Sequence, residues 1–417
     1  MKMPFLELSD WVEVEFSSQD YLSRSAKTSN ATLRNPMSNV MNARCLLATA
    51  AVSLTLACGS CADRPSQGVL IPVASTAEGT SRVAVLAATT RQRSTTDPGE
   101  MFSGERANDV SYASVVVSIP PDSARKIGAI QWPATLPGDP SREFVTVSAN
   151  YIDQKAFTAA VDDTAKQPGH SRVLVFVHGF NNRFDDAVYR FAQIVHDAKA
   201  PAIPVLFTWP SRGELRLRAY TYDRESTNFS RDALEELLDS LAKQPRVTEV
   251  NILAHSMGNW ITLEALRGRS IRASRSAYNA KSDKLKNVLM VAPDVDVDVF
   301  RTELQRMGPI RPRISLFVSR DDEALRLSRF LWGGVPRLGD VNANQEPYQA
   351  EFERNRIEVF DLTTLKAADN DAHDRAFDEA PTVAAMIRKR LSLGQELTTS
   401  RDTDIGAKVE EATTSIR

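Results

Sequence analysis

The feature that most constrains the fold is an alternation, from residue 173 onward, of short apolar runs with segments of helical periodicity. The apolar runs are mostly continuous, as in strands that are buried on both faces. Between the first two runs, Phe184, Val188, Phe191 and Val195 repeat at the spacing of one helix face. Strands that alternate with helices through short links predict an α/β fold with a doubly wound, mostly parallel sheet. The predicted strands are residues 173–177, 204–207, 250–254, 287–291, 314–318 and 357–360.

The stretch between the second and third of these strands contains two parts. Residues 209–231 are longer than a plain link between a strand and a helix, and they carry Arg212, Arg216, Arg218, Arg224 and two tyrosines. They are either a cap over a binding site that favours acyl or acidic groups, or a solvated loop. Ser230 is placed to cap a helix with one apolar stripe. The stripe consists of Leu234, Leu237, Leu238 and Leu241.

Before residue 173 the sequence has a different pattern, in which β-branched runs are separated by turn-rich stretches. Such runs predict antiparallel strands that open the sheet. Residues 63–80 are rich in Ser, Gly, Pro and Thr and predict a linker. The folded domain then spans 81–391, and the polar residues 392–417 predict a disordered tail. The N-terminal strands are predicted at residues 82–87, 113–119 and 144–148.

An uncharged apolar run at residues 45–57 follows Arg44. It falls short of the roughly 20 apolar residues that span a bilayer, and it is typical of the apolar part of a secretory signal, here residues 41–62. The alternative is an apolar core helix. The signal predicts an exported protein, periplasmic, lipid-anchored or secreted. Thr55 stands where a lipoprotein signal has Leu, and membrane anchoring through Cys58 is a hypothesis. Residues 1–40 are predicted to be a non-native or disordered leader.

Composition excludes several classes of function. The formal net charge of −2 does not favour an electrostatic nucleic-acid binder. All three cysteines lie at or before Cys61, and the five histidines form no zinc motif. Residues 294–305 begin like a calcium loop, but Val299 and Gln305 replace the required Gly and Glu. We therefore expect no metal and no cofactor, and a small-molecule substrate.

The strongest motif is Ala254-His255-Ser256-Met257-Gly258, which lies between an apolar strand and a helix. A serine flanked by small residues at this junction is typical of the nucleophile elbow of the α/β-hydrolase fold, with Ala254 replacing the usual first Gly. The tight turn requires small neighbours, and the helix that follows directs its free N–H groups at the site. Ser256 is therefore the predicted nucleophile; the alternative is a serine that only caps the helix.

A second local motif, His178-Gly179-Phe180, directly follows the first parallel strand. In this fold the loop after that strand supplies a backbone N–H that meets the N–H of the residue after the nucleophile. Phe180 and Met257 are therefore the predicted oxyanion-hole donors. His178 precedes the nucleophile, and we expect it to orient the loop rather than to act as the base.

The order of the catalytic groups along the chain selects the remaining candidates. In this fold an acid and then a histidine follow the serine, and His373 is the one histidine after Ser256. Three carboxylates remain open as the acid. Asp322 occupies the commoner position, two strands beyond the nucleophile strand, while Asp321 is adjacent to it and Asp294 follows the preceding strand.

Together these motifs resemble the bacterial α/β-hydrolases of the family called domain of unknown function nine hundred. The resemblance rests on HGFNN, FTWPS, AHSMG, APDVD and SRDDEALRLSR, with LAATTR and FSGERANDVSYASVVVSIP upstream, and extends over residues 83–391. It implies an esterase-like or lipase-like enzyme with no settled substrate, and it aligns the acid with Asp322.

The predicted function is a serine hydrolase, most simply a carboxylesterase, with Ser256, His373 and Asp322 as its triad and a small ester as substrate. A peptidase or thioesterase would use the same triad. A non-catalytic, envelope-anchored binding protein of the same fold is the alternative from another class.

Overall fold

The computed structural model describes residues 64–363, except 66, 75–76, 98, 200, 275–282, 310 and 332, together with His373. The predicted leader, the signal segment with Cys58 and the tail at 392–417 lie outside the described residues. Among the described residues, no helix combines the length and the apolar character needed to cross a membrane.

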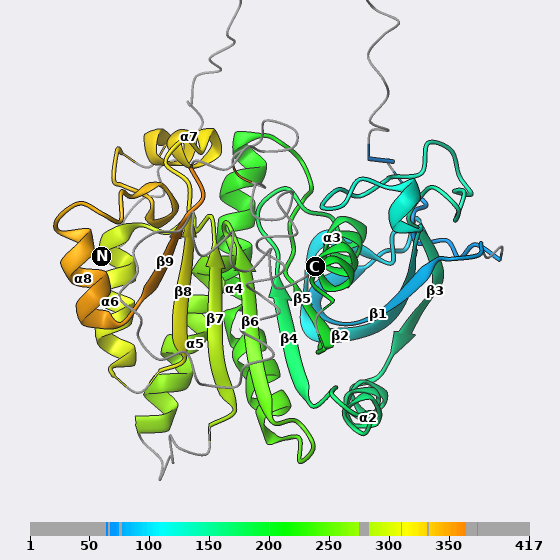
Figure 1. Cartoon of the computed structure of the whole chain (residues 1–417), viewed down its shortest axis with the longest axis horizontal. Helices are drawn as coiled ribbons and strands as arrows, with labels where there is room; N and C mark the ends of the chain where they lie inside the picture. The colour runs from blue at the N-terminus through cyan, green and yellow to red at the C-terminus, as the bar shows by residue number, and fades with distance from the viewer. Residues whose placement is uncertain are drawn as a thin grey trace, which may run out of the picture. The chain divides into compact units, whose positions relative to one another are not determined.

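The described residues form a nine-stranded mixed sheet with strand order β3-β2-β1-β5-β4-β6-β7-β8-β9 (Figure 1). The pairs β1–β2 and β2–β3 are antiparallel, and all others are parallel. The predicted α/β fold with antiparallel N-terminal strands is thus confirmed. The strands are β1 Ser81–Arg93, β2 Phe102–Ile119, β3 Val145–Ile152, β4 Arg172–Val177, β5 Ile203–Thr208, β6 Glu249–His255, β7 Leu285–Val291, β8 Arg313–Val318 and β9 Glu358–Asp361.

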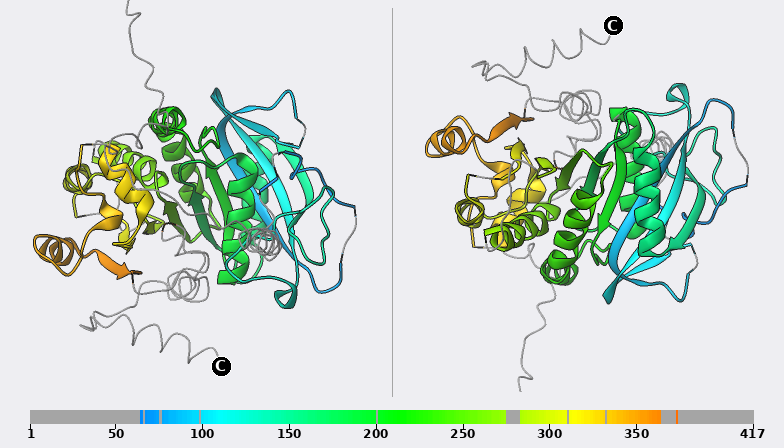
Figure 2. Two further views of the ribbon diagram at one scale, coloured as in Figure 1. Left: turned by 90° about the horizontal axis from the view of Figure 1, so that it is seen from above. Right: turned by 90° about the horizontal axis from the view of Figure 1, so that it is seen from below.

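Helices cover both faces of this sheet (Figure 2). One apolar core contains side chains of α3, and a second contains side chains of α2, α4, α5, α6 and α8. The two cores explain the continuous apolar runs, because each central strand is buried on both sides. The helices are α2 Gln154–Ala165, α3 Phe184–Ala198, α4 Leu217–Lys243, α5 Gly258–Ser274, α6 Val297–Met307, α7 Glu323–Leu331 and α8 Tyr348–Asn355, with 3₁₀ turns η1 Asp122–Ala124 and η3 Leu338–Asp340.

The region between β5 and β6 differs from the prediction. Helix α4 begins at Leu217, so much of the segment predicted as a cap or loop is helical. Ser230 lies in the interior of α4 and is buried, and its hydroxyl donates to the carbonyl of Ser226. The predicted cap at Ser230 is wrong, because a serine hydroxyl can bond to the carbonyl four residues back and stay within a helix.

Part of the segment predicted as a linker packs onto the domain. Val69 and Leu70 are buried in the core beside α3. The amide of Leu70 donates to the carbonyl of Gly99, and the hydroxyl of Tyr189 donates to that of Val69. A short apolar pair within polar sequence carries no periodic signal, so its burial depends on the surface that the rest of the fold offers.

Candidate active site

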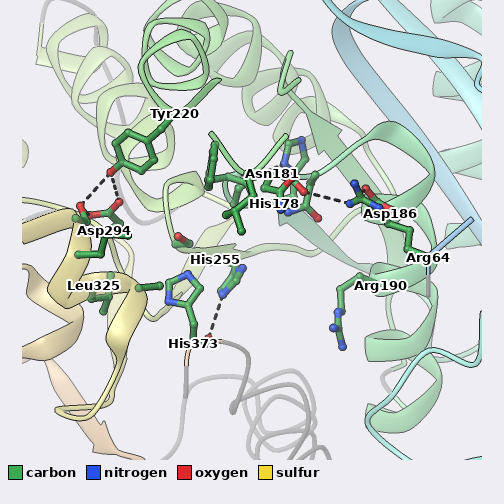
Figure 3. Close-up of a pocket in the computed structure, with 18 of the residues that line it drawn as sticks. Arg64, His178, Asn181, Asp186, Arg190, Tyr220, His255, Asp294, Leu325 and His373 are labelled. Carbon is green, nitrogen blue, oxygen red and sulfur yellow. Dashed lines mark hydrogen bonds and ion pairs between the residues drawn. The ribbon is translucent and has the colours of Figure 1, made fainter. Parts of the chain in front are cut away.

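Loops at the carboxyl ends of the parallel strands enclose a cavity of ≈420 Å³ (Figure 3). This edge is where ligands bind in open α/β sheets. The cavity is lined by Ser256, which follows β6, by Phe180, which follows β4, and by Asp294, which follows β7. His373 also lines it. The fold thus brings four of the residues named from the sequence to one pocket.

Ser256 occupies a strained turn between β6 and α5. Its φ is 51°, a left-handed conformation that residues with a side chain rarely adopt. The neighbouring glycines allow the turn to pack closely. A Cβ on Gly258 would lie 2.4 Å from the carbonyl oxygen of His178, and one on Gly179 would lie 2.8 Å from Cβ of Ser256. Only glycine fits at either position without a backbone shift.

Backbone and amide hydrogen bonds hold this turn in place. The amide of Ser256 donates to the carbonyl of Val291 at 2.9 Å. The side-chain amide of Asn259 donates to the carbonyls of Ser256 and Val291, at 3.0 and 3.1 Å. The turn is therefore tied to β7 as well as to its own strand, which restrains the position of the serine hydroxyl.

The predicted oxyanion donors come from this turn and from the loop after β4. Phe180 lines the cavity, and Met257 is buried directly after the serine. Among the described residues, the amides of Phe180 and Met257 donate no hydrogen bond to another protein group. The next residue, Asn181, has a φ of 59°, so the chain turns sharply after Phe180. Two unused N–H groups beside a serine are suited to binding a negatively charged oxygen.

His178 supports the loop that follows β4, which contains Phe180. It is buried and stacks on Trp209, with ring centroids 4.7 Å apart. Its Nδ1 lies 2.8 Å from the carbonyl oxygen of Gly179, an acceptor, so Nδ1 carries the proton. Its Nε2 then accepts from the amide of Trp209 and from the hydroxyl of Thr208. Burial, with nearby Arg91, holds the pKa of His178 well below its usual value. A neutral, fully engaged imidazole matches the predicted loop-orienting role.

Arg91, at the end of β1, is a site residue that the sequence analysis did not single out, although it ends the LAATTR motif. Its guanidinium is buried and donates to the carbonyls of Asn182 and Ser211, at 2.7 and 2.9 Å, and to the hydroxyl of Thr208 at 2.8 Å. Burial lowers the pKa of Arg91 to about 10, so it stays charged at neutral pH. Its bonds join the loops that follow β4 and β5.

Asp223 of α4 is bonded to the loop that follows β5. It accepts from the hydroxyl of Ser211 and from the amide of Arg212. Burial raises the pKa of Asp223 to about 6, and the Ser211 bond opposes that rise. The start of α4 is therefore part of the support for the site rather than a solvated loop.

His373 is held by Asp322. The distance from His373 Nδ1 to Asp322 Oδ2 is 2.7 Å. Asp322 is fully buried, and its other carboxylate oxygen accepts from the amide of Leu325 at 3.0 Å. The His373 ring also packs against the His255 ring, with centroids 4.9 Å apart (Figure 3). Nδ1 faces the carboxylate, and Nε2 lies on the other edge of a ring that lines the cavity.

The other two carboxylates have different partners. Asp321 is half-buried and accepts from the hydroxyl of Ser319 at 2.7 Å. Asp294 accepts from the hydroxyls of Tyr220 and Ser328, both at 2.6 Å. It also lies 3.4 Å from the guanidinium of Arg337. Of the three candidates that the sequence left open, Asp322 is the one whose carboxylate bonds the imidazole of His373.

The model of the family described as alpha/beta hydrolase of unknown function (DUF900) matches residues 153–390. The chain belongs to this family. The match begins at the start of α2 and contains every candidate site residue, while Arg91 lies before it. No curated protein matches the sequence.

Solved structures of hydrolases are similar to the chain at low identity. Esterase B from Lactobacillus rhamnosis is 10% identical, covers 91% of this chain and 99% of its own, and has a TM-score of 0.34. An esterase from Pyrobaculum calidifontis is 10% identical, covers 86% and 95%, and has a TM-score of 0.30. Naproxen esterase from Bacillus subtilis is 10% identical, covers 67% and 86%, and has a TM-score of 0.27. Similarity at this level carries no information on activity.

Proposed function

We propose that the protein is a serine hydrolase that cleaves carboxylic esters through an acyl-enzyme. The observation that carries the proposal is the Asp322–His373 hydrogen bond in the same cavity as Ser256, which sits on a strained elbow. A nucleophile, a base and a group that orients the base are the set that acyl transfer by serine requires.

In the proposed reaction, the Ser256 hydroxyl attacks the ester carbonyl carbon while Nε2 of His373 takes its proton. The amides of Phe180 and Met257 bind the oxygen that becomes negative, and Asp322 stabilises the charged imidazole. The C–O bond then breaks, and the alcohol leaves with the proton from His373. Water attacks the acyl-serine with His373 again as base, which releases the acid and restores the enzyme.

A fluorophosphonate probe tests the nucleophile directly. We expect the wild-type protein to be labelled and Ser256→Ala not to be, with a loss of esterase turnover on the order of 10⁶-fold. Ser328→Ala is the matched control, because Ser328 is also a buried serine that lines the cavity, and it should still be labelled. Equal labelling of wild type and Ser256→Ala would contradict the proposal, and no labelling of either would support a non-catalytic binding protein.

Substrate type is tested by comparing short p-nitrophenyl esters with aminoacyl amides and acyl thioesters. We expect kcat/KM to be highest for the oxygen esters. Faster turnover of the amides would identify a peptidase, and faster turnover of the thioesters a thioesterase.

We also propose that the protein is exported, as the apolar run at residues 45–57 predicts, and that it is anchored to the membrane through Cys58, which follows that run. Globomycin-sensitive processing and palmitate labelling of the wild type, but not of Cys58→Ala, are expected. Processing that globomycin leaves unchanged would favour a secreted or periplasmic protein.

A further inference from the structure

Exposed apolar side chains gather at two segments beside the cavity. Half of the exposed large hydrophobic residues in the described part of the chain lie at 215–217 and 327–331. Leu215 is 82% exposed, Leu327 60% and Leu331 38%, and all three line the cavity that contains Ser256. Single exposed leucines are normal, but a group that continues a pocket marks a binding site.

Helix α7 presents one face to this cavity. Ala324, Leu327, Ser328 and Leu331 line it at helical spacing, together with the buried Leu325. The start of α4 is joined to the same face, because the hydroxyls of Tyr220 and Ser328 are 3.0 Å apart. The arginines of α7 are engaged elsewhere, since Arg326 bonds Glu323 and Arg329 bonds the carbonyl of Gly334. The cavity-lining face of α7 therefore carries no charged side chain.

We propose that the substrate is an ester with an apolar chain of several carbons, which lies along Leu327 and Leu331 of α7 and against Leu215. We assign the substrate chain to this surface because the three leucines line the same cavity as Ser256 and His373. When the carbonyl of the ester lies next to Ser256, the apolar chain of the same molecule extends over these leucines, which are otherwise exposed to water. Each methylene that leaves water adds to the favourable free energy of binding, so the face favours longer chains over acetate. This inference rests on the proposed esterase function.

The test is a series of p-nitrophenyl esters from acetate to octanoate with a double variant, Leu327→Gln with Leu331→Gln. Glutamine is polar and has nearly the helix propensity of leucine. We expect kcat/KM for the octanoate to fall about 10-fold, while kcat/KM for the acetate stays within about two-fold. Phe330→Gln is the matched control, because Phe330 is 79% exposed on the same helix but does not line the cavity, and it should leave the whole series unchanged.

The outcomes separate this inference from the function on which it rests. Ser256-dependent cleavage of the acetate, without a preference for longer chains, would overturn the apolar-chain site and leave the esterase in place. An equal loss on every ester, or the same loss in Phe330→Gln, would also overturn it. A double variant that converts a dimer to a monomer in sedimentation velocity, with chain preference unchanged, would assign the face to a second copy of the chain. Absence of all esterase activity and labelling would overturn both proposals.

Discussion

The loops after β7 and β8 offer a direct comparison. Each follows a parallel strand of the sheet, and each carries a buried aspartate, Asp294 in the first and Asp322 in the second. Their partners differ. Asp322 bonds His373 and the amide of Leu325, whereas Asp294 bonds Tyr220 and Ser328 and lies beside Arg337.

Position at a sheet edge therefore does not fix the role of a carboxylate. Asp322 orients an imidazole that faces the pocket, so its removal should affect turnover. Asp294 compensates the charge of a buried cation, because Arg337 is 2% exposed. The Nε and one terminal nitrogen of Arg337 have no hydrogen-bond acceptor among the described residues, so its guanidinium depends on nearby negative charge. Removal of Asp294 should affect stability.

The largest expected effect is that of Asp322→Asn on turnover. The asparagine oxygen can still accept from the amide of Leu325. The neutral side chain no longer selects the tautomer of His373, and it no longer stabilises the charged form of that imidazole. We expect kcat to fall about 10⁴-fold. Steady-state kinetics on a short ester measure the loss, and urea unfolding should show a change in stability below about 1 kcal/mol. A variant that keeps wild-type kcat would remove Asp322 from the mechanism.

Asp294→Asn should show the opposite pattern. It removes the carboxylate charge 3.4 Å from the guanidinium of buried Arg337 and leaves Asp340 as a carboxylate that still interacts with it, which we expect to cost about 3 kcal/mol of folding free energy. The same urea experiment measures this, and kcat should fall less than about 10-fold, because the Asp322–His373 bond is untouched. If Asp294→Asn instead loses activity like Asp322→Asn at unchanged stability, the two aspartates have been assigned in the wrong order.

Tyr220→Phe sharpens the assignment of Asp294. The substitution keeps the ring contact with Phe180 and removes the hydroxyl that donates to the carboxylate. We expect a loss of about 1.5 kcal/mol in the free energy of unfolding. In the Asp294→Asn background the loss should be smaller, because the charged acceptor is gone. Equal losses in both backgrounds would show that the hydroxyl acts independently of Asp294.

Asp321→Asn should have the smallest effect. Asp321 is half-buried and bonded to Ser319, and an asparagine oxygen can keep that bond. We expect kcat within about two-fold of wild type and stability within about 0.5 kcal/mol. A large loss of kcat would restore Asp321 as a candidate for the acid.

Several elements show where local pattern was sufficient and where it was not. The parallel strands could be predicted from continuous apolar runs, because a strand that is buried on both faces has apolar residues at consecutive positions. The course of α4 did not follow, since its first turns are polar and the leucine stripe begins only at Leu234. Arg91 was missed for a related reason: a single arginine at a strand end is ordinary, and its role depends on Asn182 and Ser211, 91 and 120 residues away.

Neighbouring residues and chain order were enough to predict the strand-and-helix alternation, the elbow at Ser256 and the selection of His373 as the candidate base. Which of the three carboxylates bonds His373, and the position of Asp294 beside Arg337, became known from the folded chain. Those pairings join loops from separate strands, and hydrogen bonds between them depend on sheet register and loop path rather than on any local pattern. The apolar face of α7 beside the cavity was likewise a product of packing, since periodicity alone does not tell a core-facing stripe from one that faces a pocket.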